Sequence, residues 1–323
     1  MDALDQIEGE AAWFDGRFCG RDQFAVPAGD AGFVMGATVT EQLRTFRGRV
    51  FEPGSHARRL ASSLSLIGLE PRFAPEELMA VAERLAAHNH AILPPGTAHS
   101  PPDDLGMVIF VTAGDLASQH GGHAGEPRVG IHTFPLAFRL WAAAYAAGVA
   151  LRSVSVTQVP ETCWPLAAKV RSRLHYFLAD REAAAAEPGS RAILAHGDGR
   201  ISETSTANIA VVAGGGVLAP PAADALAGVT LGCTRQLAGD LGIAWNERSL
   251  TAADLAAADE ILLTSTPNCL LPATRLDGRP VGDGRPGPIF HRLLAAWNER
   301  AGIDIAGQAR HHAAMDQQLE SPR

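Results

Sequence analysis

Lys169 is the only lysine among the 27 lysine and arginine residues of this 323-residue chain. Arginine is permanently charged, whereas lysine offers a primary amine that can lose its proton in a buried site and attack a carbonyl. The chain therefore meets its ordinary need for positive charge with arginine. Lys169 is a candidate for a Schiff base with an aldehyde cofactor, and the alternative is a surface lysine in an arginine-rich composition.

Pyridoxal phosphate is the most demanding aldehyde cofactor, and the sequence offers candidates for its other needs. The pyridine nitrogen stays protonated beside a carboxylate, and Glu203 ends a predicted strand in GRISETSTAN. The phosphate needs backbone N–H donors at a helix start, hydroxyl groups and a cation. The candidates for the phosphate are Arg59, Val229, Thr230, Ser265 and Thr266. Each is a weak signal alone, and their order along the chain is the stronger one.

Several motifs around Lys169 resemble the fold-type IV (class IV) pyridoxal-phosphate enzymes. They are HARRL at 56–60, GDGRISETSTANIAVV, LAGVT and ILLTSTPNCLLP. This family includes branched-chain aminotransferases, D-amino-acid aminotransferases and 4-amino-4-deoxychorismate lyase. The resemblance, which extends from about residue 30 to about residue 295, implies an α/β (α+β) fold with a small α/β N-terminal domain and a larger barrel-like C-terminal domain.

The resemblance also implies roles for individual residues. Lys169 would be the Schiff-base lysine, Glu203 the partner of the pyridine nitrogen, and Asn208 a brace for the same hairpin. The residues implied for the phosphate are Arg59, Val229, Thr230 and Thr266. The implied reaction is transfer of an amino group from an amino acid, of the branched-chain or D-amino-acid type, to a keto acid, by Schiff-base exchange and a 1,3-proton transfer. The family also implies a homodimer.

Two other functions stay open at this point. Leu174 stands five residues after Lys169, where branched-chain enzymes have a tyrosine, and the spacing of Lys169, Arg173 and Leu174 is closer to the lyase branch. The alternative is therefore a 4-amino-4-deoxychorismate lyase that releases 4-aminobenzoate and pyruvate, although Gln42 replaces a threonine that lyases use. Leu231 also replaces the family's usual arginine. A non-catalytic ligand-binding relative is the lesser alternative. Such a protein would have no reason to keep a lysine, and this chain keeps its single one.

Recognition of the substrate carboxylate requires an arginine or a set of hydroxyl and N–H donors. The candidates for the substrate are Thr40, Arg44, Arg173, Pro267 and Asn268. Arg173 is preferred over Arg171, because on a helix that begins near Lys169 a residue four positions on shares the lysine's side. The other interpretation of Arg173 is a helix arginine that is solvated or paired with a nearby acid.

Composition favours small-molecule chemistry in the cytoplasm. A net charge of −8 without a basic run argues against a nucleic-acid or membrane partner. The four cysteines form no CxxC pair, so neither a zinc site nor disulfides are predicted. The longest apolar run, at 141–151, is too short to span a bilayer. His120 and His123 lack nearby ligand partners and are predicted to be solvated rather than to bind metal.

The elements that must position these residues fall into two halves. Helical spacing predicts helices in SHARRLASSLSLIGL and PEELMAVAERLAAH, followed by a mobile loop in HNHAILPPGTAHSPPDD and strands at 106–114 and 127–135. The sequence pattern of the second half predicts a helix that begins near Lys169, two hairpins and a strand at 260–265. It also predicts a closing helix in GPIFHRLLAAWNERAG. The predicted divisions are a small domain over 1–135, a linker over 136–150, a large cofactor domain over 151–306 and a disordered tail over 307–323.

Overall fold

The computed structural model describes residues 3–93 and 103–320, and the chain divides into two compact units. Unit 1 comprises Met1–Leu136 and Ala168–Ser172. Unit 2 comprises Ala137–Ala167 and Arg173–Arg323. The short segment that carries Lys169 therefore packs with unit 1, although the chain on both sides of it belongs to unit 2. Most of the predicted mobile loop, residues 94–102, lies outside the described residues.

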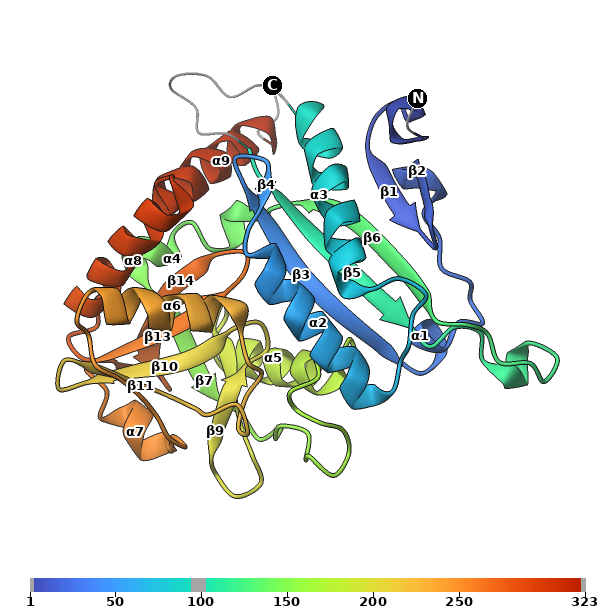
Figure 1. The fold of residues 1–323 in the computed structure, drawn as a ribbon. Helices are drawn as coiled ribbons and strands as arrows, with labels where there is room; N and C mark the ends of the chain where they lie inside the picture. The colour runs from blue at the N-terminus through green and yellow to red at the C-terminus, as the bar shows by residue number, and fades with distance from the viewer. Residues whose placement is uncertain (1–2, 94–102, 321–323) are drawn as a thin grey trace. The chain divides into compact units, whose positions relative to one another are not determined.

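Unit 1 is built on an antiparallel sheet of six strands in the order β2-β1-β6-β5-β3-β4 (Figure 1). The strands are β1 (Ala11–Phe14), β2 (Arg17–Gly20), β3 (Thr38–Phe46), β4 (Arg49–Val50), β5 (Leu105–Thr112) and β6 (Arg128–Pro135). Strand β5 pairs with β3 on one side and β6 on the other, with Thr40 opposite Phe110 and Ile109 opposite Ile131. The strands predicted at 106–114 and 127–135 are confirmed as β5 and β6.

Two helices, α2 (Pro53–Ile67) and α3 (Pro75–Ala91), cover one face of this sheet (Figure 1). Each has a proline in its first turn, where the missing N–H costs no hydrogen bond, and α2 ends at Gly68 with a φ of 69°. Their buried leucines, among them Leu60 and Leu78, join Leu43 and Ile109 of the sheet in one apolar core. The shorter helices of unit 1 are η1 (Ala3–Gln6), η2 (Arg21–Gln23), α1 (Ala31–Val34) and η3 (Ala117–Gln119).

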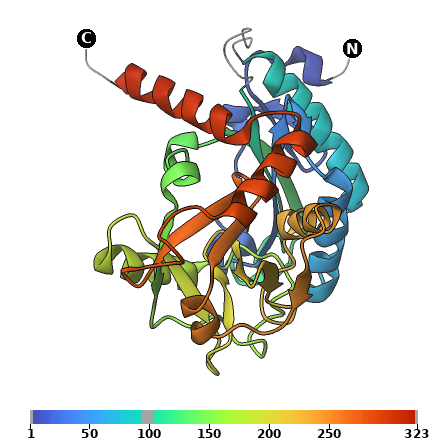
Figure 2. The ribbon, with the colours of Figure 1, turned by 90° about the vertical axis from the view of Figure 1, so that its left-hand side faces the viewer.

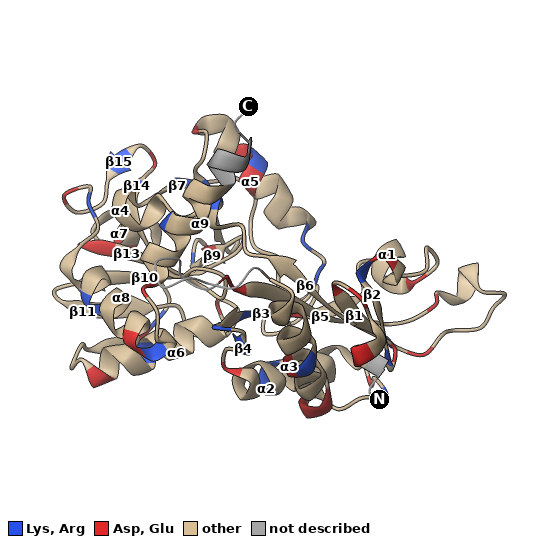
Figure 3. Cartoon of the chain, turned by 90° about the horizontal axis from the view of Figure 1, so that it is seen from above, with Lys and Arg blue, Asp and Glu red and all other residues tan. Residues whose placement is uncertain are grey.

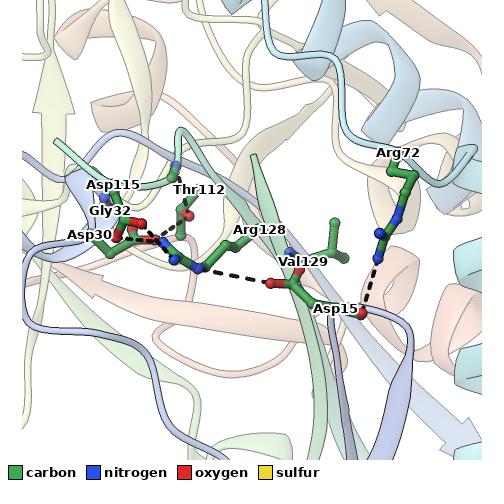
Figure 4. Close-up of polar contacts among 9 residues, drawn as sticks. Asp15, Asp30, Gly32, Arg72, Thr112, Asp115, Arg128 and Val129 are labelled. Carbon is green, nitrogen blue, oxygen red and sulfur yellow. Dashed lines mark hydrogen bonds and ion pairs between the residues drawn. The ribbon is translucent and has the colours of Figure 1, made fainter. Parts of the chain in front are cut away.

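Arg128, at the start of β6, joins distant parts of unit 1 (Figure 4). Its Nη1 and Nη2 lie 2.8 and 2.7 Å from the carboxylate oxygens of Asp115, and its Nη1 lies 3.2 Å from Oδ2 of Asp30. The hydroxyl of Thr112 donates to the same oxygen of the fully buried Asp30 at 2.8 Å. This charged network thus helps to fix the segment around Asp30 that leads into β3.

Unit 2 holds a nine-stranded sheet in which β12-β11-β10-β13-β14-β7-β8-β9 are neighbours in that order and β15 pairs with β14. The strands are β7 (Val149–Ser153), β8 (Arg191–Ala195), β9 (Ile201–Thr204), β10 (Asn208–Ala213), β11 (Gly216–Ala219), β12 (Trp245–Glu247), β13 (Glu260–Ser265), β14 (Cys269–Leu276) and β15 (Arg279–Pro280). Strand β9 also pairs with β10, with Asn208 opposite Glu203. This pairing closes the sheet into a barrel, which confirms the predicted fold class and both hairpins.

The helices of unit 2 pack on this sheet, α5 against β7 and β8, and α6 and α8 against each other and against β13. They are η4 (Phe138–Leu140), α4 (Ala144–Ala147), α5 (Leu174–Ala186), α6 (Val229–Asp240), α7 (Ala252–Ala256), α8 (Pro288–Ala301) and α9 (Ile305–Glu320). Trp297 of α8 is fully buried and donates its indole N–H to Thr234 of α6 at 3.1 Å. The predicted closing helix is confirmed as α8.

The segment predicted as a disordered tail forms helix α9, which follows α8 as a separate helix (Figure 2). The side chain of Asp304 accepts from the backbone N–H of Gly307 at 2.9 Å and so caps the helix start. Ile305 and Ala309 are buried, and His312 stacks on Phe138 of η4 with ring centroids 4.9 Å apart. A polar sequence without clear periodicity is thus ordered by contacts with a distant segment. That segment, within 136–150, was predicted as a linker and instead forms η4 and α4.

Residues with charge of both signs are interspersed along the helices and loops of each unit (Figure 3). Among residues 3–93 and 103–320, no helix has the length and apolar character needed to cross a membrane. The same part of the chain holds no group of three or more His, Cys, Asp or Glu side chains that could bind a metal ion. His120 and His123, which follow η3, are exposed.

Candidate active site

The backbone around Lys169 is fixed against β3 and α2. The N–H of Thr40 donates to the carbonyl of Lys169 at 2.9 Å, and the N–H of Arg171 donates to the carbonyl of Thr38 at 3.0 Å. The N–H of Lys169 donates to the hydroxyl of Ser63 at 3.1 Å. The lysine is therefore carried by an extended segment that is hydrogen bonded on both sides, and its backbone position is well defined within unit 1.

The prediction that a helix begins near Lys169 is wrong, because α5 begins only at Leu174. Residues just after the lysine form a bridge with β3, in which Val170 lies opposite Val39. In an extended segment, side chains two positions apart project to the same side. The helical argument that favoured Arg173 over Arg171 therefore fails, and Arg171 is the arginine that unit 1 holds beside the lysine.

Arg171 is exposed, and two contacts on the sheet hold its side chain. Its Nε donates to the hydroxyl of Thr40 at 3.3 Å, and its guanidinium lies 5.9 Å from the ring centroid of Phe110. The hydroxyl of Thr40 in turn donates to the carbonyl of Ile109 at 3.0 Å. Thr40, predicted to contact substrate, is thus buried and supports Arg171.

Arg59, the predicted phosphate ligand, forms a buried pair with Glu41. Its Nε and Nη2 donate to the two carboxylate oxygens of Glu41 at 2.8 and 2.7 Å, and Nδ1 of His56 lies 2.7 Å from Oε2 of the same carboxylate. Glu41 and His56 are fully buried, and the side chain of Arg59 is 10% exposed. A bidentate pair of this kind fixes the plane of the guanidinium.

The charges of this cluster follow from its geometry. Burial alone would raise the pKa of Glu41, but the charge and hydrogen bonds of Arg59, with the hydrogen bond from His56, lower it to about 2. Burial lowers the pKa of His56 and outweighs the opposing effect of Glu41. His56 is therefore neutral near pH 7 and donates from Nδ1, and its Nε2 is buried without a hydrogen-bond partner among the described residues.

Arg44, a predicted substrate residue, belongs to the core of unit 1 instead. Only 1% of it is exposed, its Nη2 lies 3.9 Å from Oδ2 of the buried Asp104, and its guanidinium lies 4.0 Å from the ring centroid of Phe46. Its Nε donates to the carbonyl of Thr45 at 3.2 Å. These contacts orient Arg44 inward, so a substrate carboxylate would have to displace Asp104 to bind it.

Glu203 of unit 2 lies where β9 meets β10 and is 8% exposed. The hydroxyl of Tyr176 donates to its Oε1 at 2.7 Å, and Nδ2 of Asn208 donates to its Oε2 at 3.2 Å. Asn208 also donates to the carbonyl of Leu226 at 2.7 Å. The predicted brace by Asn208 therefore has a specific form, because the amide links the carboxylate to the loop that precedes α6.

Tyr176 is a residue of this cluster that the sequence analysis did not identify, because the helix was expected to begin earlier, near Lys169. Since α5 starts at Leu174, Tyr176 lies in its first turn and reaches Glu203. Burial, and next the charge of Glu203, raise the pKa of Tyr176. The phenol therefore stays protonated and is a permanent hydrogen-bond donor.

Arg173 is engaged within unit 2. Its Nη2 donates to the carbonyl of Ser205, and its guanidinium lies 4.5 Å from the ring centroid of Tyr176. Neither predicted alternative, a solvated arginine or one paired with an acid, describes these contacts. The guanidinium instead covers the ring of Tyr176 and the turn after β9.

The start of α6 has the features expected of an anion site. Gly228 is its N-cap residue, and Val229 and Thr230 form the first turn with Thr230 buried. A Cβ on Gly228 would come within 1.9 Å of Oδ1 of Asn208, so only glycine fits there. The N–H groups of a first helical turn have no partners within the helix and attract anions. Unit 2 thus places these donors next to the residue that holds Glu203.

The turn after β13 holds the remaining predicted residues. β13 ends at Ser265, and the side chains of Ser265 and Asn268 are buried. The hydroxyl of Tyr145 donates to the carbonyl of Asn268 at 2.7 Å, which fixes the turn that contains Thr266 and Pro267. Among the described residues, Oδ1 of Asn268 and Oγ1 of Thr264 are buried without hydrogen-bond partners. Thr264 lies opposite Asn208 in the sheet, so this strand end is close to the Glu203 cluster.

Comparisons with known proteins agree with this arrangement. Residues 38–276 match the model of the amino-transferase class IV family. The chain is 28% identical to a D-alanine aminotransferase of Bacillus licheniformis, over 88% of this chain and 94% of the relative. It is 26% identical to one from Staphylococcus aureus (strain COL), over 88% and 95%.

Solved structures give the same result for the fold. The branched-chain aminotransferase from Thermoproteus uzoniensis, with norvaline, has a TM-score of 0.78 and 28% identity, covering 93% of this chain and 96% of that one. The Escherichia coli branched-chain amino acid aminotransferase has a TM-score of 0.81 at 24% identity, covering 93% and 96%. A branched-chain enzyme from T.th., complexed with N-(5'-phosphopyridoxyl)-L-glutamate, has a TM-score of 0.77 at 23% identity, covering 94% and 96%.

The family match covers most of the chain and contains the lysine, the Glu203 hairpin and the α6 turn, so these motifs and the barrel fold have one explanation. The chain belongs to the amino-transferase class IV family and is an enzyme of the aminotransferase type.

Proposed function

We propose that this protein is a pyridoxal-phosphate-dependent aminotransferase that moves an amino group from an amino acid to a keto acid. The observation that carries the proposal is Lys169, the only lysine of the chain, whose backbone is hydrogen bonded on both sides in unit 1. A lysine that serves only as a charge would not need such a fixed position. The family and its structural relatives support the same cofactor.

The residues present in each unit fit pyridoxal phosphate. Unit 1 offers the amine of Lys169 and, in Arg59, a cation held in place by Glu41. Unit 2 offers a buried carboxylate in Glu203 and a helix start whose glycine leaves no room for a side chain. The buried and unpartnered oxygens of Thr264 and Asn268, among the described residues, lie at the strand end beside these groups and are suited to accept further donors.

When bound, pyridoxal phosphate supplies a carbonyl carbon that reacts with amines and a ring that takes up negative charge. Lys169 would hold the cofactor through Nζ until the substrate amine took its place, and the freed Nζ would then move the proton from the substrate's Cα to C4′, the cofactor carbon that Nζ had held. Glu203 would keep the proton on the ring nitrogen. Arg59, the N–H groups of Val229 and Thr230, and the hydroxyls of Ser265 and Thr266 would hold the phosphate.

We assign the substrate carboxylate to Arg171 rather than to Arg173 or Arg44. Arg171 is exposed, lies two residues from the reacting amine and is positioned by Thr40 and by the backbone of β3. Arg173 is occupied with Tyr176 and Ser205, and Arg44 with Asp104. Pro267 and Asn268 remain candidates for the substrate side chain. The donor is an amino acid of the D-alanine or branched-chain type, as the relatives suggest.

The test is a spectrum followed by an assay. Purified protein with added pyridoxal phosphate should show a long-wavelength absorption band, and borohydride reduction should fix the cofactor to the single peptide that contains Lys169. Amino transfer to 2-oxoglutarate or pyruvate is then measured with D-alanine and L-leucine as donors. Absence of the band would refute the proposal. Release of 4-aminobenzoate from 4-amino-4-deoxychorismate, without any keto acid, would establish the lyase instead.

We also propose a homodimer in a reducing cytoplasm. The resemblance to the family supports the dimer, and the absence of disulfides among the four cysteines, all of which are free, fits the compartment. Sedimentation at decreasing protein concentration, with activity measured in the same samples, tests the dimer. A monomer that keeps full activity at nanomolar concentration would contradict it.

A further inference from the structure

The phenol of Tyr176 and the amide of Asn208 both donate to the carboxylate of Glu203, and the two hydrogen bonds differ in length. The phenol of Tyr176 is 2.7 Å from Oε1, whereas the amide of Asn208 is 3.2 Å from Oε2. A short O–H to carboxylate bond is among the stronger hydrogen bonds in proteins. Of these two contacts, the one with Tyr176 therefore restricts more strongly how Glu203 can turn.

The direction of this hydrogen bond follows from a third residue. Nε2 of Gln158 donates to the hydroxyl oxygen of Tyr176 at 3.2 Å and to the hydroxyl of Ser202 at 3.0 Å. The amide cannot be turned around, because its Oε1 accepts from the backbone N–H of Val159 at 2.9 Å. Since the phenol oxygen accepts from Gln158, its one hydrogen is left for Glu203.

The ring of Tyr176 is fixed as well as its hydroxyl. The guanidinium of Arg173 lies over one side of it, and the ring centroid of His175 is 3.9 Å away. The backbone N–H of Gln158 donates to the carbonyl of Ala195 on β8 at 2.8 Å, so the base of the arrangement is tied to the barrel. The phenol can therefore neither rotate away from Glu203 nor reverse its hydrogen bond without loss of other contacts.

We infer that Tyr176 is a positioning residue that orients Glu203 and keeps it ionised toward the protonated ring nitrogen of the cofactor, with Gln158 fixing the donor direction of its hydroxyl. The inference rests on the proposed function of Glu203. A hydrogen bond to the charged form of a carboxylate favours that form. Loss of the phenol hydroxyl should therefore weaken the hold on the ring proton, while the ring, its packing and the barrel stay in place.

The experiment compares wild type, Tyr176→Phe, Glu203→Gln and the double variant, each with pyridoxal phosphate. Three quantities are measured: the dissociation constant of the cofactor, the pH midpoint of its long-wavelength band, and kcat and KM for the amino donor. For Tyr176→Phe we expect cofactor affinity to fall about tenfold and kcat about 10- to 100-fold, with KM nearly unchanged, as for loss of a hydrogen bond to a charged group. The pH midpoint of the cofactor's long-wavelength band should move by on the order of one pH unit relative to the wild type.

The double variant separates positioning from general packing. In the Glu203→Gln background, removal of the same hydroxyl should change affinity and kcat by less than about twofold, because the charge it serves is already gone. Gln158→Met leaves Tyr176 intact and should shift the pH midpoint of the long-wavelength band in the same direction as Tyr176→Phe, by a smaller amount. If Tyr176→Phe does not fold, Gln158→Met takes its place in the experiment.

The outcomes distinguish this inference from the proposed function. A wild-type protein that binds no pyridoxal phosphate would overturn both. A wild type that binds it, with Tyr176→Phe showing the same affinity and the same band titration, would overturn the inference alone. So would an equal loss of kcat from the Tyr176 change in both backgrounds, because that result describes a packing effect independent of Glu203.

Discussion

Two of the buried carboxylates of the protein, Glu41 and Glu203, have surroundings that differ in character. In unit 1, Glu41 accepts two hydrogen bonds from the cationic Arg59 and one from His56. In unit 2, Glu203 accepts a hydrogen bond from the phenol of Tyr176 and one from the amide of Asn208, and both of these donors are neutral. The first arrangement satisfies the carboxylate's charge within the protein. The second orients the carboxylate with neutral donors.

This difference teaches how one kind of side chain serves two purposes. A buried carboxylate with a bidentate arginine is a structural ion pair, and its use is to hold Arg59 in one orientation. The neutral donors Tyr176 and Asn208 orient Glu203, and the proposed cofactor would bring a positive charge to it at the ring nitrogen. We therefore expect loss of Glu41 to act mainly on stability and loss of Glu203 mainly on rate.

The largest effect is expected at Lys169, on which the functional meaning of both carboxylates depends. Lys169→Arg keeps the positive charge but cannot bond covalently to the cofactor, so turnover should fall by about 10³-fold or more. Steady-state assays with D-alanine or L-leucine measure the loss, and circular dichroism checks that the fold is retained. Turnover near the wild-type rate would remove the basis for the comparison.

Glu41→Gln should lower the free energy of unfolding by about 3–5 kcal/mol, because it leaves the guanidinium of Arg59 without its buried counter-charge. Urea unfolding of the cofactor-free protein gives the value. Glu203→Gln is the matched control, since it makes the same chemical change in the other unit and is expected to cost much less. Equal losses in the two variants would contradict the distinction between the two carboxylates.

Glu203→Gln should instead lower kcat by about 10²- to 10³-fold, as does removal of a preorganised electrostatic group, while the protein still binds pyridoxal phosphate. The amide matches the carboxylate in shape but cannot hold a proton on the ring nitrogen. The measurement is kcat beside a cofactor titration. An unchanged rate would make Glu203 a structural residue like Glu41.

The pH dependence of stability sharpens the comparison further. The pKa of Glu41 is lowered from 4.5 to about 2 on folding, so its contribution is fully present above pH 4.5 and is lost as the pH falls toward 2. The wild type should therefore lose up to about 3 kcal/mol more than Glu41→Gln over this interval. Urea unfolding of both proteins at several pH values measures the difference. Parallel curves would show that Glu41 is not paired in the folded protein.

The smallest effects concern the two arginines after the lysine. Arg171→Ala should raise KM for the amino donor about tenfold with little change in cofactor affinity, because a carboxylate contact is lost. Arg173→Ala should leave KM near the wild-type value and act, through Tyr176, on cofactor affinity and kcat. Donor and cofactor titrations of both variants decide between them. The reverse pattern would return the substrate carboxylate to Arg173.

Several features followed from the sequence because they depend on local order. The single lysine, the glycine before α6, the two hairpins and the helix that carries Arg59 are written in residue type and spacing over short stretches. The barrel could be named only by resemblance, since its closure depends on the pairing of Asn208 with Glu203 and on parallel contacts of β7 with both β8 and β14.

The errors share one cause, which is that the partners of a side chain were not known. Arg44 looked like a substrate ligand until Asp104, far along the chain, was placed beside it. The segment after 306 looked disordered because its stacking partner, Phe138, lies far away in the sequence. Tyr176 was not identified from the sequence because a helix was expected from near Lys169, whereas Val170 bridges to β3 and α5 begins only at Leu174.

The sequence by itself therefore determined which residue could carry the cofactor and which family the chain resembles, because a reactive amine and short motifs need no knowledge of distant contacts. Only the tertiary structure decided which carboxylate is neutralised, which arginine is held beside the lysine and which tyrosine donates to Glu203. The physical reason is that charge, hydrogen-bond direction and burial are properties of a side chain's neighbours, and those neighbours come from strands and helices that meet only after folding.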